Sequence, residues 1–167
     1  ESQSNFSRRC PDTYVKASFE EALTDVEFIK KTATVDYIHV TPPNKSFRKY
    51  GSEAGIDVEG GKHIVKIFDM LKKMPEVPMV GIEMTPNFWT FEKERTALIN
   101  RARKQGFEIK RKNLAPSNYG SCQGGEVLFI LLVKSKYESK RARWQFPTKQ
   151  TAKARSSVRE IMTADKE

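Results

Sequence analysis

The run VLFILLV at Val127–Val133 is the most apolar stretch of the chain, and it decides the fold class. Seven successive apolar residues, most of them β-branched or aromatic, predict a strand that is buried on both faces. The glycine pair Gly124-Gly125 precedes the run and indicates a turn at its entrance. We therefore expect this strand to lie in the centre of a sheet.

Upstream of this run, strand-like and helix-like segments alternate along the chain. Short β-rich runs lie at 14–17, Val35–Val40, Pro78–Met84 and Phe107–Asn113. Apolar residues at helical spacing mark three segments between them, at 18–29, 64–71 and 91–105. Strands separated by helices of about 12 residues predict an α/β protein with a parallel sheet. Phe107–Asn113 alternates as a strand on the edge of the core.

Local signals indicate where these elements begin and end. Ser18 with Glu21 three residues later has the pattern of a capping box, so the first helix is expected to start there. Pro42-Pro43 ends the strand at Val35–Val40, because neither strand nor helix continues through two prolines. Gly106 is expected at the C′ position of the third helix.

Length and composition limit the class of protein. The chain has 167 residues, of which 38% are apolar and 31% charged, which fits one globular domain with a modest core. No stretch approaches the roughly 18 apolar residues of a membrane-spanning helix, so we expect no membrane association. Cys10 and Cys122 lie far apart, which favours a reducing compartment, cytoplasm or nucleus, and makes no metal site.

The net charge of +9 indicates an anionic partner, with nucleic acid ahead of a membrane surface. A soluble protein that is merely basic remains the alternative. Residues 136–167 hold nine Lys or Arg against four Asp or Glu, so more than half of the excess lies there. We therefore divide the chain into an α/β domain at 1–135 and a basic C-terminal arm at 136–167.

Three groups of residues are candidates for binding nucleic acid. They are Lys45, Arg48 and Lys49 in the loop after Pro42-Pro43, Arg101, Lys110 and Arg111 in a second basic cluster, and Lys140, Arg141, Arg143 and Trp144 in the arm. Contacts from such residues to phosphates would make binding steeply dependent on salt. Trp144 and Phe146 either stack on bases or tie the arm back to the body.

Functional residues of doubly wound sheets gather where strands reach their carboxyl ends. Here those places are Thr41–Gly61, Glu83–Trp89 and Pro116–Glu126. In the first of them, Pro42-Pro43-Asn44 is followed by Phe47 and Gly51. This spacing resembles the cytosine-5 DNA methyltransferases, which place Pro-Pro-Cys after their fourth strand, a Phe three positions beyond the Cys and a Gly four further on.

Two further segments resemble the same family, in the same order along the chain. Ile82–Pro86 is similar to the family's Glu-Asn-Val-Pro at the end of the next strand, and 114–123 is similar to its Asn-Ala-x-x-Tyr-Gly-x-x-Gln. Phe146-Pro147 and Ser157–Glu160 resemble the segment before the family's target-recognition domain. The resemblance covers Pro11 to Met162. It implies a partial Rossmann-like, doubly wound and mostly parallel sheet of the S-adenosylmethionine-dependent methyltransferase type.

The chain departs from the family's pattern where the chemistry occurs. The family adds a cysteine thiolate to a flipped-out cytosine, and Asn44 stands at that position. Glu83 matches the glutamate that contacts the cytosine ring, while Gly125 and Val127 stand where the family has two arginines. The sequence contains no Phe-x-Gly-x-Gly turn for S-adenosylmethionine, so we expect the first strand and the cofactor loop to be missing and no cofactor to bind.

Several single residues allow a plainer interpretation. Cys122 as a relocated nucleophile is far less expected than an inert buried thiol. Glu83 either keeps the contact to the base or simply caps the following turn. His39 is expected to be a packed, hydrogen-bonded core residue, and His63 to face solvent at the start of a helix.

Three functions follow from these observations. The first is a catalytically inactive methyltransferase-like module that holds nucleic acid. The second is a structural subunit of a larger complex, in which another protein chain covers the sheet edge left by the missing strand. The third is a split enzyme that becomes active, or stimulates an active one, with a partner chain. An amino-methyltransferase is less expected, because no aromatic residue follows Thr41-Pro42-Pro43-Asn44.

Overall fold

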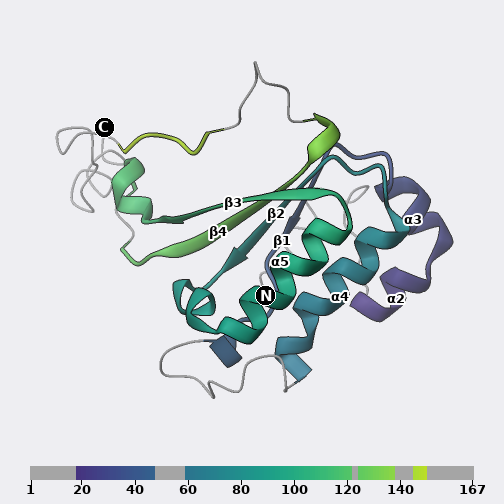
Figure 1. Cartoon of the computed structure of the whole chain (residues 1–167), viewed down its shortest axis with the longest axis horizontal. Helices are drawn as coiled ribbons and strands as arrows, with labels where there is room; N and C mark the ends of the chain where they lie inside the picture. Colours follow the sequence, from purple (N-terminus) through teal and green to yellow (C-terminus); the bar gives the residue numbers. More distant parts are fainter. Residues whose placement is uncertain (1–17, 48–58, 122–123, 138–144, 150–167) are drawn as a thin grey trace, which may run out of the picture.

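The computed structural model describes residues 18–47, 59–121, 124–137 and 145–149, and they form an α/β domain around a four-stranded sheet (Figure 1). The strands are β1 (Tyr37–Val40), β2 (Met79–Met84), β3 (Phe107–Leu114) and β4 (Val127–Lys134), in the spatial order β1-β2-β4-β3. β1 and β2 are parallel, and β4 is antiparallel to both β2 and β3. Three of the four strands therefore run in one direction, which confirms the mostly parallel α/β sheet.

The apolar run Val127–Val133 lies inside the sheet as expected, but its direction differs from a purely parallel arrangement. It forms β4 and is paired on both sides, to β2 and to β3. β3 leads to β4 through the 3-10 helix η4 (Pro116–Tyr119) and a glycine turn, with no α-helix in the described part of the connection. Parallel neighbours need a longer crossover, so this connection reverses the chain.

The first helical segment is divided in two. α2 (Phe19–Thr24) starts at the expected capping box of Ser18 and Glu21, and α3 (Val26–Thr32) follows it directly. Asp25 closes the first helix and caps the second, where its carboxylate accepts the Phe28 N–H at 3.0 Å. A residue that caps a new helix leaves the helical conformation, and this breaks the single helix expected there. The expected strand at 14–17 lies outside the described residues.

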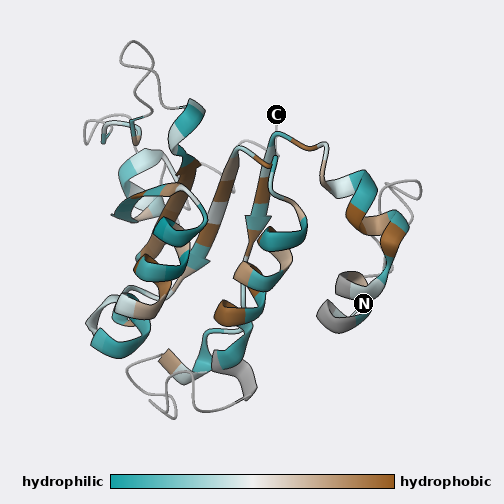
Figure 2. Ribbon diagram, turned by 45° about the vertical axis from the view of Figure 1, so that its right-hand side comes forward, coloured by the Kyte–Doolittle hydropathy of each residue, from teal (hydrophilic) through white to brown (hydrophobic). Residues whose placement is uncertain are grey.

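The core lies between the sheet and two longer helices, α4 (Glu59–Lys73) and α5 (Glu92–Lys104), which run side by side on one face (Figures 1 and 2). The strands contribute four side chains with no exposed surface to this core, namely Val80, Ile82, Ile130 and Leu132. The helices contribute Ile67, Phe68, Leu71 and Leu98 to the same core. Burying each such side chain stabilises the fold by roughly 1.5–3 kcal/mol before entropy is counted.

The end of α5 matches its expectation. Gly106 follows α5 with φ +76°, the left-handed conformation that glycine adopts without strain, and leads directly into the edge strand β3. After β4, the short 3-10 helix η5 (Ser135–Tyr137) precedes a gap in the description. Within the described ranges, no helix has the length and apolar character needed to cross a membrane.

Candidate functional site

Three loops meet at the edge of the sheet where β1, β2 and β3 end. The register pairs Val40 with Ile82, Met84 with Leu128, and Leu114 with Val127, so the three strand ends and the start of β4 lie close together. We call the segments beyond these ends, Thr41–Phe47, Thr85–Phe91, Ala115–Ser121 and Gly124–Glu126, the carboxyl edge. The structure thus brings together the three segments that carry the sequence motifs.

The loop after β1 is held against the loop after β2 by aromatic packing. It ends in the 3-10 helix η1 (Lys45–Phe47), and Phe47 has no exposed surface. The Phe47 ring lies edge-on to Phe88 at 5.1 Å and to Phe91 at 5.4 Å between centroids. Asn87 donates its side-chain N–H to the Phe47 carbonyl at 3.0 Å. The 3-10 helix η3 (Pro86–Thr90) therefore fixes the position of the motif that contains Asn44.

Asn44 is half-buried and directly precedes η1. Its backbone carbonyl accepts the Phe47 N–H at 3.0 Å, which closes the turn that follows Pro42-Pro43. Pro42 is buried and Pro43 is exposed, and the fixed φ of the two prolines restricts the direction in which the chain leaves β1. The side chain at this position is a neutral amide on a turn closed by a backbone hydrogen bond.

Glu83 lies near the end of β2 and faces away from the helices. Its Oε2 is 3.6 Å from Nε2 of His39, and both side chains are more than one third exposed. His39 also contacts the Tyr37 hydroxyl through Nδ1 at 3.0 Å and stacks on Phe129 at 5.6 Å. His39 is thus hydrogen-bonded as expected, but it is exposed, because alternate residues of the edge strand β1 point away from the core.

Tyr37 leans across the sheet from β1 to β2. A Cβ atom at Gly81 would overlap the Tyr37 hydroxyl oxygen, so the absence of a side chain at Gly81 makes room for the phenol. Burial raises the pKa of the Tyr37 phenol above its ordinary value. The neutral phenol is therefore the form next to His39 at neutral pH.

His63, expected to face solvent, is half-buried in α4.

The two positions that match the family's arginines carry no charge. Gly125 is exposed with φ +91°, and Val127 begins β4 opposite Leu114. The positive φ requires glycine or a strained residue at position 125. Cys122, the alternative nucleophile, lies outside the described residues.

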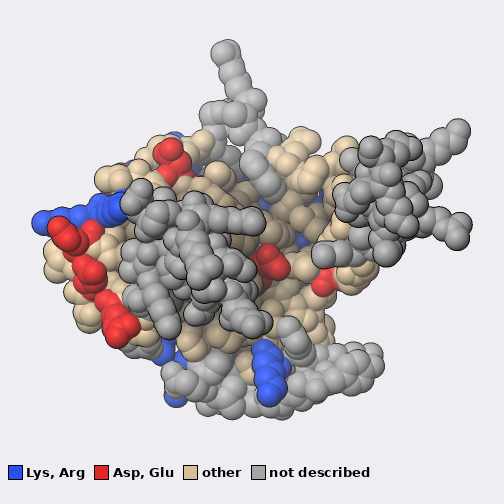
Figure 3. Space-filling view, turned by 180° about the vertical axis from the view of Figure 1, so that it is seen from behind, with Lys and Arg blue, Asp and Glu red and all other residues tan. Residues whose placement is uncertain are grey.

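Four of the expected nucleic-acid-binding residues lie in the described part of the chain, and these four do not form one patch. Lys45 is exposed at the carboxyl edge and Arg101 is half-buried on α5. Lys110 and Arg111 are neighbours on β3 and therefore point to opposite faces of the sheet. In the view from behind, the described Lys and Arg side chains are scattered over the surface (Figure 3). Outside the described residues lie Arg48, Lys49, Lys140, Arg141, Arg143 and Trp144.

A residue that the sequence analysis missed lies beside Arg111. The Trp89 ring has the Arg111 guanidinium 4.4 Å from its centroid, and the Trp89 carbonyl accepts from Nη1 of Arg95 at 3.1 Å. The signal for this residue was available, because Trp89 follows Pro86 in a loop between a strand and a helix, where exposed aromatic residues often have a role.

The C-terminal segment docks on the other face of β3. Nζ of Lys112 donates to the Pro147 carbonyl at 3.1 Å and lies 5.9 Å from the centre of the Phe146 ring. The Tyr119 hydroxyl donates to the same carbonyl at 3.4 Å. These contacts support the interpretation in which Phe146 ties the arm to the body.

Two kinds of binding site are relevant to the described residues, a metal cluster and a glycine-rich turn at the start of an α-helix. The described residues contain no group of three or more His, Cys, Asp or Glu side chains able to hold a metal ion. The glycines with positive φ in the described ranges are Gly106, Gly120 and Gly125, and each lies next to β3, η4 or β4. None opens an α-helix, so none builds the glycine-rich turn that the family uses for its cofactor.

Comparisons with known proteins agree with the fold. No family model and no curated protein sequence matches the chain. The chain superimposes on a mutant of Spodoptera frugiperda DNMT2 with a TM-score of 0.64 and 16% identity, covering 90% of this chain and 45% of that one. It superimposes on the Entamoeba histolytica methyltransferase EhMeth with a TM-score of 0.62 and 11% identity, covering 89% and 46%.

A third structure comes from Escherichia coli. It is described as a DNA modification methyltransferase encoded within a prophage, and it matches with a TM-score of 0.55 and 16% identity over 73% of this chain and 34% of that one. The chain thus spans less than half the length of the structures that it matches. Over that length, it has the α/β fold of these methyltransferases.

Proposed function

We propose that this chain is a cytosine-5 DNA methyltransferase-like protein that acts as a nucleic-acid-binding or structural subunit of a larger complex and does not itself transfer methyl groups. One observation carries the proposal. Asn44 lies directly after Pro42-Pro43 at the end of β1, on a turn closed by its own carbonyl. In the family that the sequence resembles, this position holds the nucleophilic cysteine.

The chemistry at the carboxyl edge supports the loss of activity. The family's reaction needs a thiolate, whereas the carboxamide of Asn44 is neutral and is not a nucleophile of that kind. Glu83 keeps its place at the end of β2, but it faces the imidazole of His39. Gly125 and Val127 supply no charged group where the family has guanidinium groups. Within the described part of this edge, the nucleophile and the two guanidinium groups are therefore replaced, and only the glutamate is kept.

The outer edge of β1 supports a role in a complex. Among the described strands, β1 pairs with β2 alone. An unpaired strand edge exposes backbone N–H and C=O groups that another chain can cover. An apolar cavity of about 670 Å³ lies beside the start of β1, lined by Val35, Met79, Val133 and Tyr137 among others. This cavity offers a partner protein an apolar contact in addition to the edge of β1.

We expect no methyl transfer by the purified chain. Incubation with labelled S-adenosylmethionine and duplex DNA, single-stranded DNA or RNA should leave the nucleic acid unlabelled, because Asn44 cannot form the covalent adduct. Labelling by the chain alone would contradict the proposal. Labelling only after addition of the proteins that copurify with it from its native source would instead support the split enzyme.

Nucleic-acid binding should depend steeply on salt. With about three phosphate contacts, affinity should fall roughly 40-fold when the salt concentration rises fourfold, since each contact adds about −0.9 to the logarithmic slope. Lys45→Gln with Lys110→Gln should reduce that slope by about 1.8. Fluorescence anisotropy of labelled duplex DNA, single-stranded DNA and RNA at two salt concentrations measures both effects.

Two lysines at the other end of the sheet provide a matched control. Lys72 and Lys73 are exposed in the last turn of α4. The double variant Lys72→Gln and Lys73→Gln removes the same charge and should leave the salt slope close to that of the unmodified chain. Equal effects of the two double variants would show only nonspecific attraction to a basic protein. Absence of binding at low salt would leave a purely structural role.

A further inference from the structure

β3 is the outermost strand on the side of the sheet opposite β1, and its backbone is open along one side in the described structure. Ser135 N–H donates to the Gly106 carbonyl at 3.0 Å, which places this pair in the hydrogen-bonded class of the antiparallel ladder. Hydrogen-bonded and non-hydrogen-bonded pairs alternate. Phe107, Ile109 and Arg111 therefore direct their backbone N–H and C=O groups away from β4, toward the open side.

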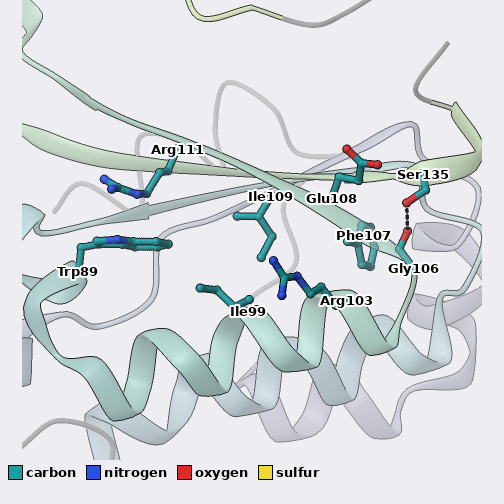
Figure 4. Close-up of a pocket in the computed structure, with 9 residues that line it drawn as sticks. All are labelled: Trp89, Ile99, Arg103, Gly106, Phe107, Glu108, Ile109, Arg111 and Ser135. Atoms are coloured by element: carbon teal, nitrogen blue, oxygen red, sulfur yellow. Dashed lines mark hydrogen bonds between the residues drawn. The ribbon is translucent and has the colours of Figure 1, made fainter. Parts of the chain in front are cut away.

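A cleft runs beside this open backbone, between β3 and α5 (Figure 4). It has a volume of about 530 Å³, within the range of ligand-binding clefts. Ile99 of α5 and Ile109 of β3 form its apolar floor. Gly106 and Ser135 lie at one end, where the Ser135 hydroxyl donates to the Gly106 carbonyl at 3.2 Å, and Trp89 and Arg111 lie at the other.

The charge of the cleft is mainly positive. Arg103 extends from α5 toward Ile109 in the middle of the cleft, and the Arg111 guanidinium lies over the Trp89 ring at its end (Figure 4). Both arginines are exposed. Glu108 also lines the cleft, close to the Ser135 end. Negative charge in a ligand is therefore favoured along the part of the cleft between Trp89 and Arg103.

We propose that an extended acidic segment of another protein adds to the outer edge of β3 as a further strand, with Asp or Glu side chains at alternate positions in the cleft. The open N–H and C=O groups of Ile109 and Arg111 pair with its backbone, which is the mode of strand addition. Its carboxylates reach Arg111 and Arg103 from alternate positions of the added strand. The aliphatic stems of its acidic side chains lie on Ile99 and Ile109.

Charge and chemistry favour this occupant over two others. A second copy of the chain would bring Lys110, Arg111 and Lys112 of one β3 opposite the same basic residues of the other, and like charges directly opposite each other destabilise a strand pair. Single-stranded nucleic acid binds by stacking its bases on exposed aromatic rings, but Arg111 already covers one face of the Trp89 ring. Nucleic acid also has no backbone groups that continue a β-ladder, whereas a peptide does.

The test uses the full chain and a capped peptide of alternating Glu and Thr residues, with affinity measured by isothermal titration calorimetry. The alternating Lys and Thr peptide should not bind. Two further peptides carry N-methyl groups on one or the other alternating set of amides. Because only one set faces β3 in an added strand, one methylated peptide should lose binding and the other should keep it.

Variants of the chain locate the site. Arg103→Gln with Arg111→Gln should weaken binding of the Glu-Thr peptide by about tenfold or more, since two charge-assisted contacts are lost. Lys72→Gln with Lys73→Gln removes the same charge elsewhere and should have no effect. Both arginines are exposed, so the double variant is expected to fold, which its circular dichroism spectrum and melting temperature check.

Three results would overturn the proposal. One is equal binding of both methylated peptides, which would indicate nonspecific attraction to acidic chains. Another is unchanged affinity in the Arg103 and Arg111 double variant. The third is displacement of the peptide by a single-stranded oligonucleotide whose own binding depends on these arginines, which would assign the cleft to nucleic acid. Methyl transfer and the effects of Lys45 and Lys110 are independent readouts, so failure here leaves the proposed function untouched.

Discussion

Phe47→Ala is expected to lower the free energy of unfolding by about 3–5 kcal/mol, the usual loss for a buried Phe reduced to Ala. Phe47 has no exposed surface, and its ring packs edge-on against Phe88 and Phe91. Truncation would leave a cavity where the loop after β1 meets the loop after β2, and it would remove two aromatic pairs. Stability measured by denaturant titration provides the number.

Two further measurements make this prediction specific. Phe47→Leu keeps most of the side-chain volume, so its loss should be well below that of Phe47→Ala, at about 1–2 kcal/mol. Asn87→Ala removes the hydrogen bond to the Phe47 carbonyl and should cost about 1 kcal/mol. A loss below about 1 kcal/mol for Phe47→Ala would show that the two loops are not joined through this ring, because truncation of a buried Phe normally costs several times more.

The positions of the four described strands were predicted from the sequence, whereas the direction of β4 was missed. An apolar run such as Val127–Val133 fits any strand buried on both faces, whichever way it runs. The information on direction lay in the connection, because the segment between Leu114 and Val127 has no amphipathic helical pattern and parallel neighbours require a crossover. Connection length was therefore a better indicator of direction than the strand itself.

The meeting of the three loops was predictable, and the arrangement of the basic residues was not. The loops meet because β1, β2 and β3 run in the same direction, which follows from the alternation of strands and helices. Lys110 and Arg111 were grouped by their closeness in sequence, although neighbours on a strand point to opposite faces. The expectation that His39 lies in the core was wrong for a related reason. β1 is an edge strand among the described strands, and alternate residues on it, including His39, face away from the core.

The cleft beside β3 could not be predicted from sequence patterns. It depends on Trp89 in η3, on Ile99 and Arg103 in α5, and on β3 itself, so three separate elements must be placed before it exists. The pairing of Arg111 with Trp89 joins residues 22 positions apart and has no periodic signal. Such a site becomes visible only when the order of the strands places β3 at the outside of the sheet.

The second large effect is expected at Leu132 in the interior strand β4. Leu132 has no exposed surface, pairs in register with Val80 and Ile109, and belongs to the core between the sheet and α4 and α5. Leu132→Ala should therefore cost about 2–5 kcal/mol of unfolding free energy, measured by denaturant titration. This is a large fraction of the roughly 5–15 kcal/mol that stabilises a typical domain.

The neighbouring residue provides the matched control. Val133 points to the opposite face of β4 and is only half-buried, so Val133→Ala should cost about 1 kcal/mol or less. Equal losses at the two positions would mean that the face away from α4 and α5 is as closely packed as the core face. A larger loss for Leu132→Ala than for Val133→Ala would show that packing between the sheet and the helices contributes more to stability than packing on the other face. In that case the outer face, which carries His39 and Glu83, tolerates change without unfolding, and the site can be tested by mutation independently of the fold.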